Sequence, residues 1–217
     1  IEIDTIKLEI LDRIDTGDDP EIFDIDFSNN FIAVSNEDDN QLTIIDLNNK
    51  KIIESISNVG VEPEGVNFSP NGKLIYVTSE GTSSVLIIDM EKRKIVNEIL
   101  VGNRPRRGLF VNDGKEYWVS NELSGTVGVI DTTKQELKET IKFSIKGIRE
   151  NQITPVDFAY AKKKNIVFVT LGNASHVAAV DASTYEVKKY ILAGKRVWGA
   201  DITSDEKELV VTNGNSD

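Results

Sequence analysis

Residues 60–102 read GVEPEGVNFSPNGKLIYVTSEGTSSVLIIDMEKRKIVNEILVG, and this stretch decides the fold of the chain. It opens with a Gly-x-x-Pro motif and then holds four apolar runs of strand length, separated by turn-forming residues. The runs are rich in β-branched and aromatic residues and lack a sustained helical spacing of apolar positions. Because one such sheet cannot bury both of its faces, copies of the unit must stack.

The unit recurs along the chain with a period near 42 residues. Three markers show the period: the motif prolines, the aspartates that close the third run, and the valines that end the second run. They are Pro20, Pro63, Pro105 and Pro155 (with Val197 in the fifth place); Asp4, Asp46, Asp89, Asp131 and Asp181; and Val34, Val77, Val119 and Val169. Four short strands in a repeat of this length predict an all-β fold, a β-propeller of four-stranded antiparallel blades.

The repeats predict a single propeller domain over residues 1–217, with about five blades' worth of sequence. We expect full blades at about 17–59, 60–101, 102–147 and 148–193, and partial blades at 1–16 and 194–217. Two arrangements fit the partial blades. In the first, residues 1–16 complete the blade that begins at 194 and close a five-bladed ring. In the second, the chain is a fragment of a larger propeller and has unpaired sheet edges.

Composition narrows the classes of function. The chain has no cysteine, which excludes disulfides and thiol catalysis, and its net charge is -11 at pH 7. That charge argues against nucleic acids and anionic membrane surfaces as partners. No apolar stretch is long enough for a membrane helix, so we expect no membrane insertion. We also expect the chain to be a monomer. A signal peptide is not visible, but a leader would lie upstream of this sequence.

In a propeller blade the strands, a to d from the centre outward, alternate in direction. The d-to-a loops and b-to-c turns therefore share one face, here called the mouth face, and the a-to-b and c-to-d turns share the other, here called the turn face. We interpret the turn face as structural, because Asp, Asn and Gly there have local backbone roles. The mouth face carries an acidic sector in the first two full blades and a basic sector in the later ones.

The residue after each motif proline begins the innermost strand and should approach the central channel. These residues are Glu21, Glu64, Arg106, Val156 and Trp198. With their neighbours they form a candidate ligand site at the channel mouth, consisting of Glu21, Glu64, Arg106, Arg107, Arg149, Arg196 and Trp198. Such a set could hold a planar polar ligand or a divalent or lanthanide ion. The alternative is that the loops are charged because they contact water, with opposite charges neutralised across the ring.

Other features carry weaker signals. The insertion Ile148–Thr154 is either a lid or partner contact above the mouth or a tolerated surface insertion. His176, the one histidine, aligns with ordinary strand positions and cannot form a typical zinc site without cysteine. Residues 37–40 (EDDN) lack the spacing of a dedicated calcium loop. We predict no catalytic residues and no protein-held metal, and we interpret aspartates such as Asp89 and Asp131 as turn caps.

The segments LIYVT (74–78), VLIID (85–89) and VGNRP (101–105) resemble the YVTN-type propeller repeat. More narrowly, GDDPEIF (17–23), SNEDDN (35–40), VEPEG (61–65), EYWVS (116–120) and GKRVW (194–198) resemble the propeller family associated with pyrroloquinoline-quinone-dependent catabolism. That resemblance covers essentially the whole chain. It implies a seven-bladed ring, which favours the fragment arrangement, and a periplasmic location beside quinoprotein alcohol oxidation.

Three functions follow as hypotheses. The first is a non-catalytic periplasmic scaffold that binds a protein partner or a small polar ligand, including pyrroloquinoline quinone, on the mouth face. The second is a hydrolase resembling the propeller lactonases, for which Glu21, Glu64 and Arg106 are the candidate residues. The third is a redox subunit carrying haem or quinone, which a single histidine disfavours.

Overall fold

The computed structural model describes residues 1–26 and 28–216, and it confirms an all-β propeller built from four-stranded antiparallel sheets. The first full blade, blade one, contains β3 (Pro20–Asp26), β4 (Phe31–Asn36), β5 (Gln41–Asp46) and β6 (Lys51–Ser57). Blade two contains β7 (Pro63–Phe68), β8 (Leu74–Ser79), β9 (Ser84–Asp89) and β10 (Lys94–Leu100).

Blade three contains β11 (Pro105–Val111), β12 (Glu116–Asn121), β13 (Thr126–Asp131) and β14 (Glu136–Lys142). Blade four contains β15 (Pro155–Ala161), β16 (Ile166–Leu171), β17 (His176–Asp181) and β18 (Val187–Leu192). The short helices are η1 (Glu150–Gln152), η2 (Lys162–Lys164) and η3 (Gly172–Ala174). Among the described residues no helix is long and apolar enough to cross a membrane.

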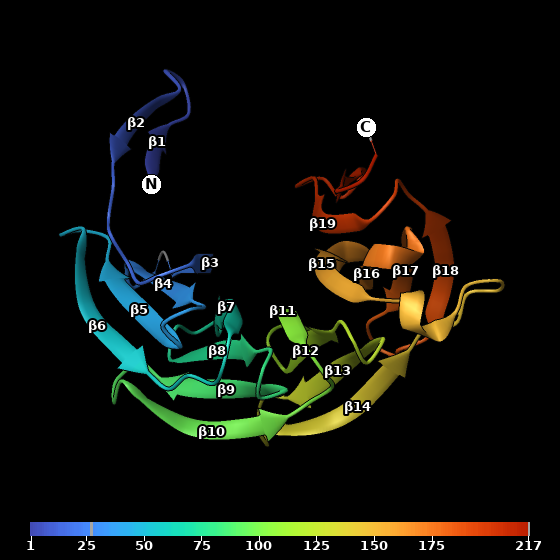
Figure 1. The fold of residues 1–217 in the computed structure, drawn as a ribbon, viewed down its shortest axis with the longest axis horizontal. Helices are drawn as coiled ribbons and strands as arrows, with labels where there is room; N and C mark the ends of the chain where they lie inside the picture. The colour runs from blue at the N-terminus through green and yellow to red at the C-terminus, as the bar shows by residue number, and fades with distance from the viewer. Residues whose placement is uncertain (27, 217) are drawn as a thin grey trace.

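The blades fan around a central opening, with the motif proline or its replacement as the first residue of β3, β7, β11, β15 and β19 at the inner edge (Figure 1). Two smaller sheets flank the full blades: β1 (Glu2–Asp4) with β2 (Glu9–Asp12), and β19 (Val197–Ile202) with β20 (Leu209–Asn213). In the described residues these two sheets are not paired with each other, and a wide gap separates them in Figure 1. The closed five-bladed arrangement is therefore not the one adopted here.

The core lies between neighbouring blades, where the middle strands press their apolar faces together. Ile75, Val77 and Ile88 of blade two pack against the buried Ala33, Leu42 and Ile44 of blade one. Tyr76, Val85 and Ile87, on the opposite face of blade two, pack against Tyr117, Val119 and Ile130 of blade three. The two middle strands of blade two thus alternate between two interfaces, which explains why they are apolar at almost every position.

The Gly-x-x-Pro motif requires glycine at its first position because the end of strand b in the same blade lies directly against it. Gly60 has φ +92°, and a Cβ there would come 2.2 Å from the hydroxyl oxygen of Ser79. At Gly102 the corresponding distance is 2.7 Å, to Cβ of Asn121. The side chains of Ser79 and Asn121 therefore leave no room for a Cβ at these glycines.

A hydroxyl near the end of strand b links each blade to the next. The hydroxyls of Ser35, Thr78, Ser120 and Thr170 donate to the backbone carbonyls of Glu64, Arg106, Val156 and Trp198, respectively, at 2.6–2.7 Å. Each hydroxyl also accepts a backbone N–H from strand a of its own blade, such as that of Gly65 at 2.7 Å for Thr78. These contacts, here called the hydroxyl links, position the residues that reach the channel mouth.

On the turn face, the aspartates that close the third strands cap the turns that follow them, as the sequence predicts. Asp89 Oδ1 accepts the backbone N–H groups of Glu91 and Lys92 at 3.0 and 2.9 Å, and Asp131 does the same for Thr133 and Lys134. These hydrogen bonds lower the pKa of the Asp89 and Asp131 carboxyls below the usual range. The aspartates are turn caps, as expected.

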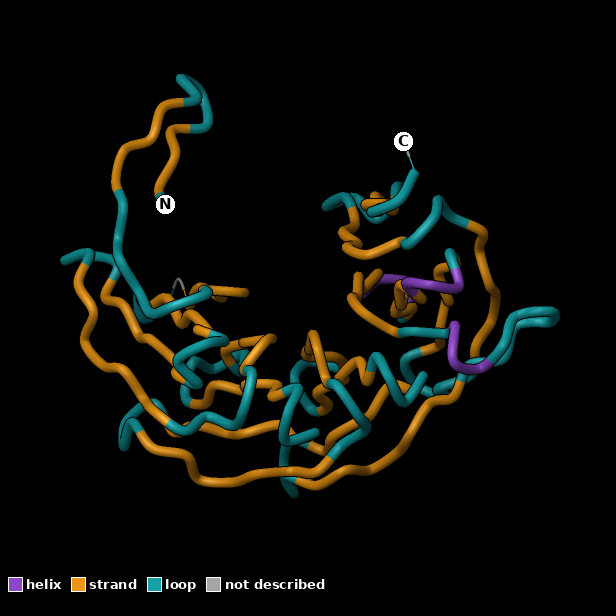
Figure 2. The backbone as a smooth tube through the Cα atoms, viewed as in Figure 1, coloured by secondary structure: helices purple, strands orange, loops and turns teal. Residues whose placement is uncertain are grey.

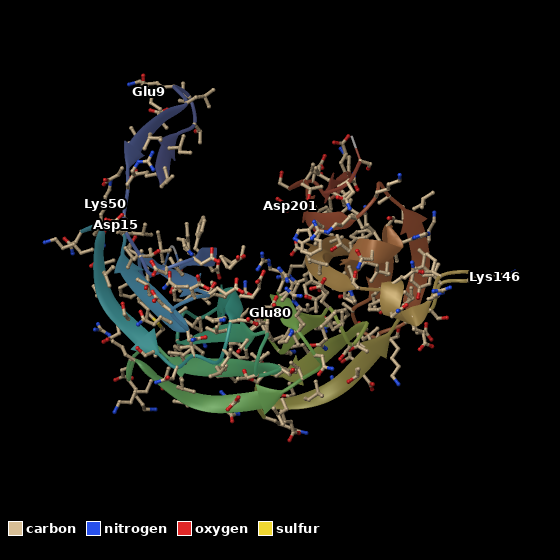
Figure 3. All side chains as sticks on the ribbon, in the orientation of Figure 1. Glu9, Asp15, Lys50, Glu80, Lys146 and Asp201 are labelled. Atoms are coloured by element: carbon tan, nitrogen blue, oxygen red, sulfur yellow. The ribbon has the colours of Figure 1, made fainter. Side chains whose placement is uncertain are left out.

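The insertion before blade four packs along its neighbours. Ile153 and Thr154 are buried, and the Thr154 hydroxyl accepts the backbone N–H of Asn173 at 2.8 Å. The preceding loop, which holds Lys146, projects from the outer rim, away from the central opening (Figures 1 and 3). Figure 2 shows this projection as loop. Helix η1, which follows it, lies against η3 in the b-to-c turn of blade four. The lid or partner contact considered for Ile148–Thr154 stays a prediction.

Candidate functional site at the channel mouth

The residues after the motif prolines lie at the inner ends of the blades, held there by the hydroxyl links. Glu64 and Val156 are 1% exposed, whereas Glu21, Arg106 and Trp198 keep part of their surface exposed. Backbone hydrogen bonds join each d-to-a loop, here called the lead-in loop, to the b-to-c turn of the blade that it enters. Examples run from Glu80 N to Glu62 O at 2.9 Å and from Glu122 N to Arg104 O at 2.9 Å. Glutamates of these turns therefore stand beside the mouth.

Arg106 is the centre of an ion-pair network that joins blades two and three. Its Nη2 lies 3.0 Å from Glu64 Oε1, and its Nη1 lies 2.6 Å from Glu80 Oε1 and 3.3 Å from Glu122 Oε2. The side chains are well buried, with exposed fractions of 12% for Arg106 and 2% for Glu64. Glu80 lies between the inner ends of the two blades in Figure 3. We call this set, with Arg104 and Arg107, the Arg106 network.

Two more arginines complete the network. Arg104 Nε donates to Glu80 Oε2 at 2.7 Å, and Arg107 Nη1 lies 2.6 Å from Glu64 Oε1. Because the contact between Arg107 and Glu64 lacks hydrogen-bond geometry, Arg107 Nη1 is a buried donor without an acceptor in the described chain. Arg106 Nε is a second such donor. Burial raises the pKa of Glu64, while the charges of Arg107 and Arg106 oppose that rise.

An aromatic stack covers the network on the side of blade four. The Arg106 guanidinium lies 5.1 Å from the ring centroid of Trp198, and that of Arg196 lies 4.1 Å from it. Both distances are within the range of cation–π attraction. Because blade four contributes only Val156 at this level, the indole of the next blade can approach Arg106. Arg196 makes no ion pair within the described part of the chain.

The acidic sector lies on the opposite side of the network. Asp19, Glu21 and Glu37 bring one carboxylate oxygen each to within 4.8 Å of one another, and Glu37, Glu62 and Glu80 form a second such group. Burial, followed by the charges of Glu21 and Glu64, raises the pKa of Glu37 from 4.5 to about 7. Of these residues only Glu80 has a cationic partner in the described chain. Carboxylate oxygens suit a hard cation, but an acidic cluster alone does not establish one.

The structure thus brings together most, but not all, of the residues predicted for the site. Arg106, Glu64 and Arg107 meet in one network, and Arg196 and Trp198 meet beside it. Glu21 belongs to the acidic sector. Arg149 is the exception, because it is the exposed N-cap of helix η1 and takes part in no ion pair among the described residues.

Three glutamates of the b-to-c turns, Glu37, Glu80 and Glu122, were not among the residues predicted for the site. The hydroxyl links were not predicted either, although a signal was present: a serine or threonine follows the valine that ends the second apolar run in every repeat, as in Val77-Thr78 and Val119-Ser120. Opposite charges pair within the Arg106 network, whereas Glu80 is the one carboxylate of the acidic sector with a cationic partner among the described residues.

Comparison with known proteins identifies one family. The model of the family described as "Cytochrome D1 heme domain" matches residues 26–155. No match was found among curated protein sequences.

Two solved structures resemble the chain in fold. One is Kuenenia stuttgartiensis hydrazine synthase, with 21% identity, a TM-score of 0.81, and coverage of 89% of this chain and 55% of that chain. The other is the β-propeller domain of Myceliophteria thermophila Cps50 (Swd1), with 13% identity, a TM-score of 0.74, and coverage of 93% and 64%, respectively. The chain therefore spans somewhat more than half the length of these proteins, and the likeness is one of fold.

Proposed function

The chain belongs to the cytochrome D1 haem domain family, and from that premise we propose that it is a non-catalytic binding module whose mouth face holds a protein partner or a small polar ligand. The observation that carries the proposal is the uneven pairing of charge around the mouth. The Arg106 network satisfies Glu64, Glu80 and Glu122, whereas Asp19, Glu21, Glu37 and Glu62 have no cationic partner among the described residues.

The family name raises the question of a haem. A haem iron takes an axial protein ligand, usually His and otherwise Cys, Met or Tyr. His176 begins β17, the third strand from the centre, and its Nδ1 lies 2.6 Å from the carbonyl oxygen of Ala174. There is no cysteine, and the one methionine, Met90, packs against the hydrophobic core. The described mouth residues therefore do not fit axial ligation of a haem iron.

We place this module in the periplasm, beside pyrroloquinoline-quinone-dependent alcohol oxidation. The support is the resemblance of segments such as VEPEG (61–65) and GKRVW (194–198) to the quinone-associated propellers. The cytochrome D1 domain family is itself periplasmic, which agrees at family level. A quinone with several carboxylates is a planar anion, and Arg196 and Trp198 offer a cation and an aromatic face to such a ligand.

The test is thermal unfolding with calcium, a lanthanide ion, pyrroloquinoline quinone and simple lactones added one at a time. A ligand at about 100 times its Kd adds roughly 2.7 kcal/mol to the stability of the folded state. We expect a shift with one of them that is lost in Glu21→Gln or Trp198→Ala and kept in Glu98→Gln, a control on the outermost strand of blade two. A cooperative transition that no compound shifts would overturn the small-ligand form of the proposal and leave the protein partner.

One observation favours the hydrolase as a second candidate. A general acid or base works best with a pKa near the operating pH, and burial together with the neighbouring carboxylates raises the pKa of Glu37 to about 7. Glu37 lies beside Glu21, one of the residues considered for this role. Lactone hydrolysis that falls at least about tenfold in Glu37→Gln and persists in Glu98→Gln would establish this alternative. No turnover in either protein would rule it out.

A further inference from the structure

A cavity of about 300 Å³ lies on the turn face between blades two and three, at the opposite ends of the strands from the mouth. Its apolar wall comes from Pro70, Leu74 and Phe110. The a-to-b turns of the two blades meet at its edge, where a Cβ on Gly114 would lie 2.7 Å from Cγ of Pro70. The volume is at the lower end of the range for small-molecule sites.

Tyr76 forms part of the wall of this cavity and is fully buried. Its ring packs against Phe110 and Tyr117, with centroid distances of 5.1 and 4.8 Å. Tyr117 donates its hydroxyl to Asn67 Oδ1 at 2.9 Å, but the hydroxyl of Tyr76 has no hydrogen-bond partner in the described chain. A buried hydroxyl without a partner is costly, and it points to an acceptor that the chain does not supply.

The remaining polar groups of the wall are largely engaged. Ser69 donates to Asn71 Oδ1 at 2.8 Å and accepts the backbone N–H of Leu74, and Thr132 donates to the carbonyl oxygen of Gly114 at 2.7 Å. Burial, followed by the charge of Asp131, raises the pKa of Tyr76 to about 12, so its hydroxyl stays protonated and can donate. The carboxylate of Asp113 also lines the cavity and disfavours anions.

We propose that this cavity binds a small neutral cyclic molecule carrying a carbonyl oxygen, which accepts the hydrogen bond of the Tyr76 hydroxyl. Because the Tyr76 hydroxyl is closed to solvent, binding requires the partly exposed side chains of Leu74 and Phe110 to move aside. The ring of the ligand would then lie against Leu74, Pro70 and Phe110, and the carbonyl would supply the missing acceptor. Lactones and simple aromatic ketones belong to this class. The site is independent of the mouth and of the function proposed for it.

Acetophenone and ethylbenzene are suitable probes, because they have similar shapes and differ in the carbonyl oxygen. We expect the wild-type chain to bind acetophenone more tightly than ethylbenzene by about tenfold, the order of one hydrogen bond to a buried group. In Tyr76→Phe the preference should disappear while ethylbenzene binds as before. Titrations followed by backbone NMR should shift the amides of residues 69–74 and 110–114.

Two variants complete the test. Leu74→Trp places an indole in the cavity and should abolish binding of both probes, whereas Trp198→Ala at the mouth should leave both affinities unchanged. Tyr76→Phe should be at least as stable as the wild type, because the lost hydroxyl has no protein partner. The proposal is overturned if wild type binds neither probe up to its solubility, if the preference survives Tyr76→Phe, or if Tyr76→Phe is clearly less stable than wild type.

Discussion

The hydroxyl of Thr78 donates a 2.6 Å hydrogen bond to the backbone carbonyl of Arg106, 28 residues further along the chain and one blade away. The same hydroxyl accepts the backbone N–H of Gly65 in its own blade. One side chain thus ties the interface between two blades to the position of the arginine at the centre of the mouth network. The stability of the ring and the geometry of the site therefore depend on the same contact.

Thr78→Val should lower the free energy of unfolding by about 1–3 kcal/mol, because it leaves the Arg106 carbonyl and the Gly65 N–H buried without their partner while preserving side-chain shape. Urea denaturation measures the change. Thr140→Val, at an exposed position of the outermost strand β14, is the matched control and should change stability little. Equal losses of unfolding free energy in both variants would show that the Thr78 hydroxyl stabilises the fold no more than an exposed hydroxyl does.

Arg106→Met should destabilise the fold by about 3 kcal/mol, because removing one member of a buried ion pair leaves the others uncompensated. Glu64 and Glu80 would then face each other with only Arg104 and Arg107 nearby. Combining Arg106→Met with Glu64→Gln should cost less than the sum of the two single changes, as a double-mutant cycle would reveal. Additive losses would contradict the direct coupling described for these residues.

Because the pKa of Glu37 is raised in the folded chain, we expect its contribution to stability to decrease as the pH rises. Its pKa is about 7 in the folded chain and 4.5 ordinarily, so between these values the folded state holds the proton and the unfolded state does not. This contribution to stability is complete below the unfolded pKa and is lost as pH rises through about 7. The Tm of Glu37→Gln should consequently fall less than that of wild type between about pH 5 and about pH 8. Parallel Tm curves would contradict this assignment.

Gly60→Ala should destabilise the chain by more than about 1 kcal/mol, because it combines a left-handed φ with a clash against Ser79. Gly147→Ala is a matched control, since Gly147 has φ +85° and nothing within 4 Å of an added Cβ. The difference between the two variants in chemical denaturation isolates the close approach of the lead-in loop to strand b. Equal effects would show that backbone conformation alone requires the glycine.

Much of the fold was predictable from the sequence because its determinants are local. Turn residues, the alternation of short apolar runs and the spacing of Pro20, Pro63 and Pro105 all act within one blade, and repetition makes them visible. The position of Glu64 and Arg106 at the inner strand ends followed from the same period. Arg149 does not join the other predicted residues, because it lies in the insertion, outside the register of the other repeats.

The sequence by itself thus determined the blade architecture and which residues lie at the inner ends of the blades, since both depend on neighbours close in the chain. Only the tertiary structure decided which charges pair. Arg106 meets Glu64, Glu80 and Glu122 at separations of 42, 26 and 16 residues, and Glu37 is left without a cation among the described residues. Such pairing depends on side-chain reach and on distances across the ring, which the packing of whole blades sets.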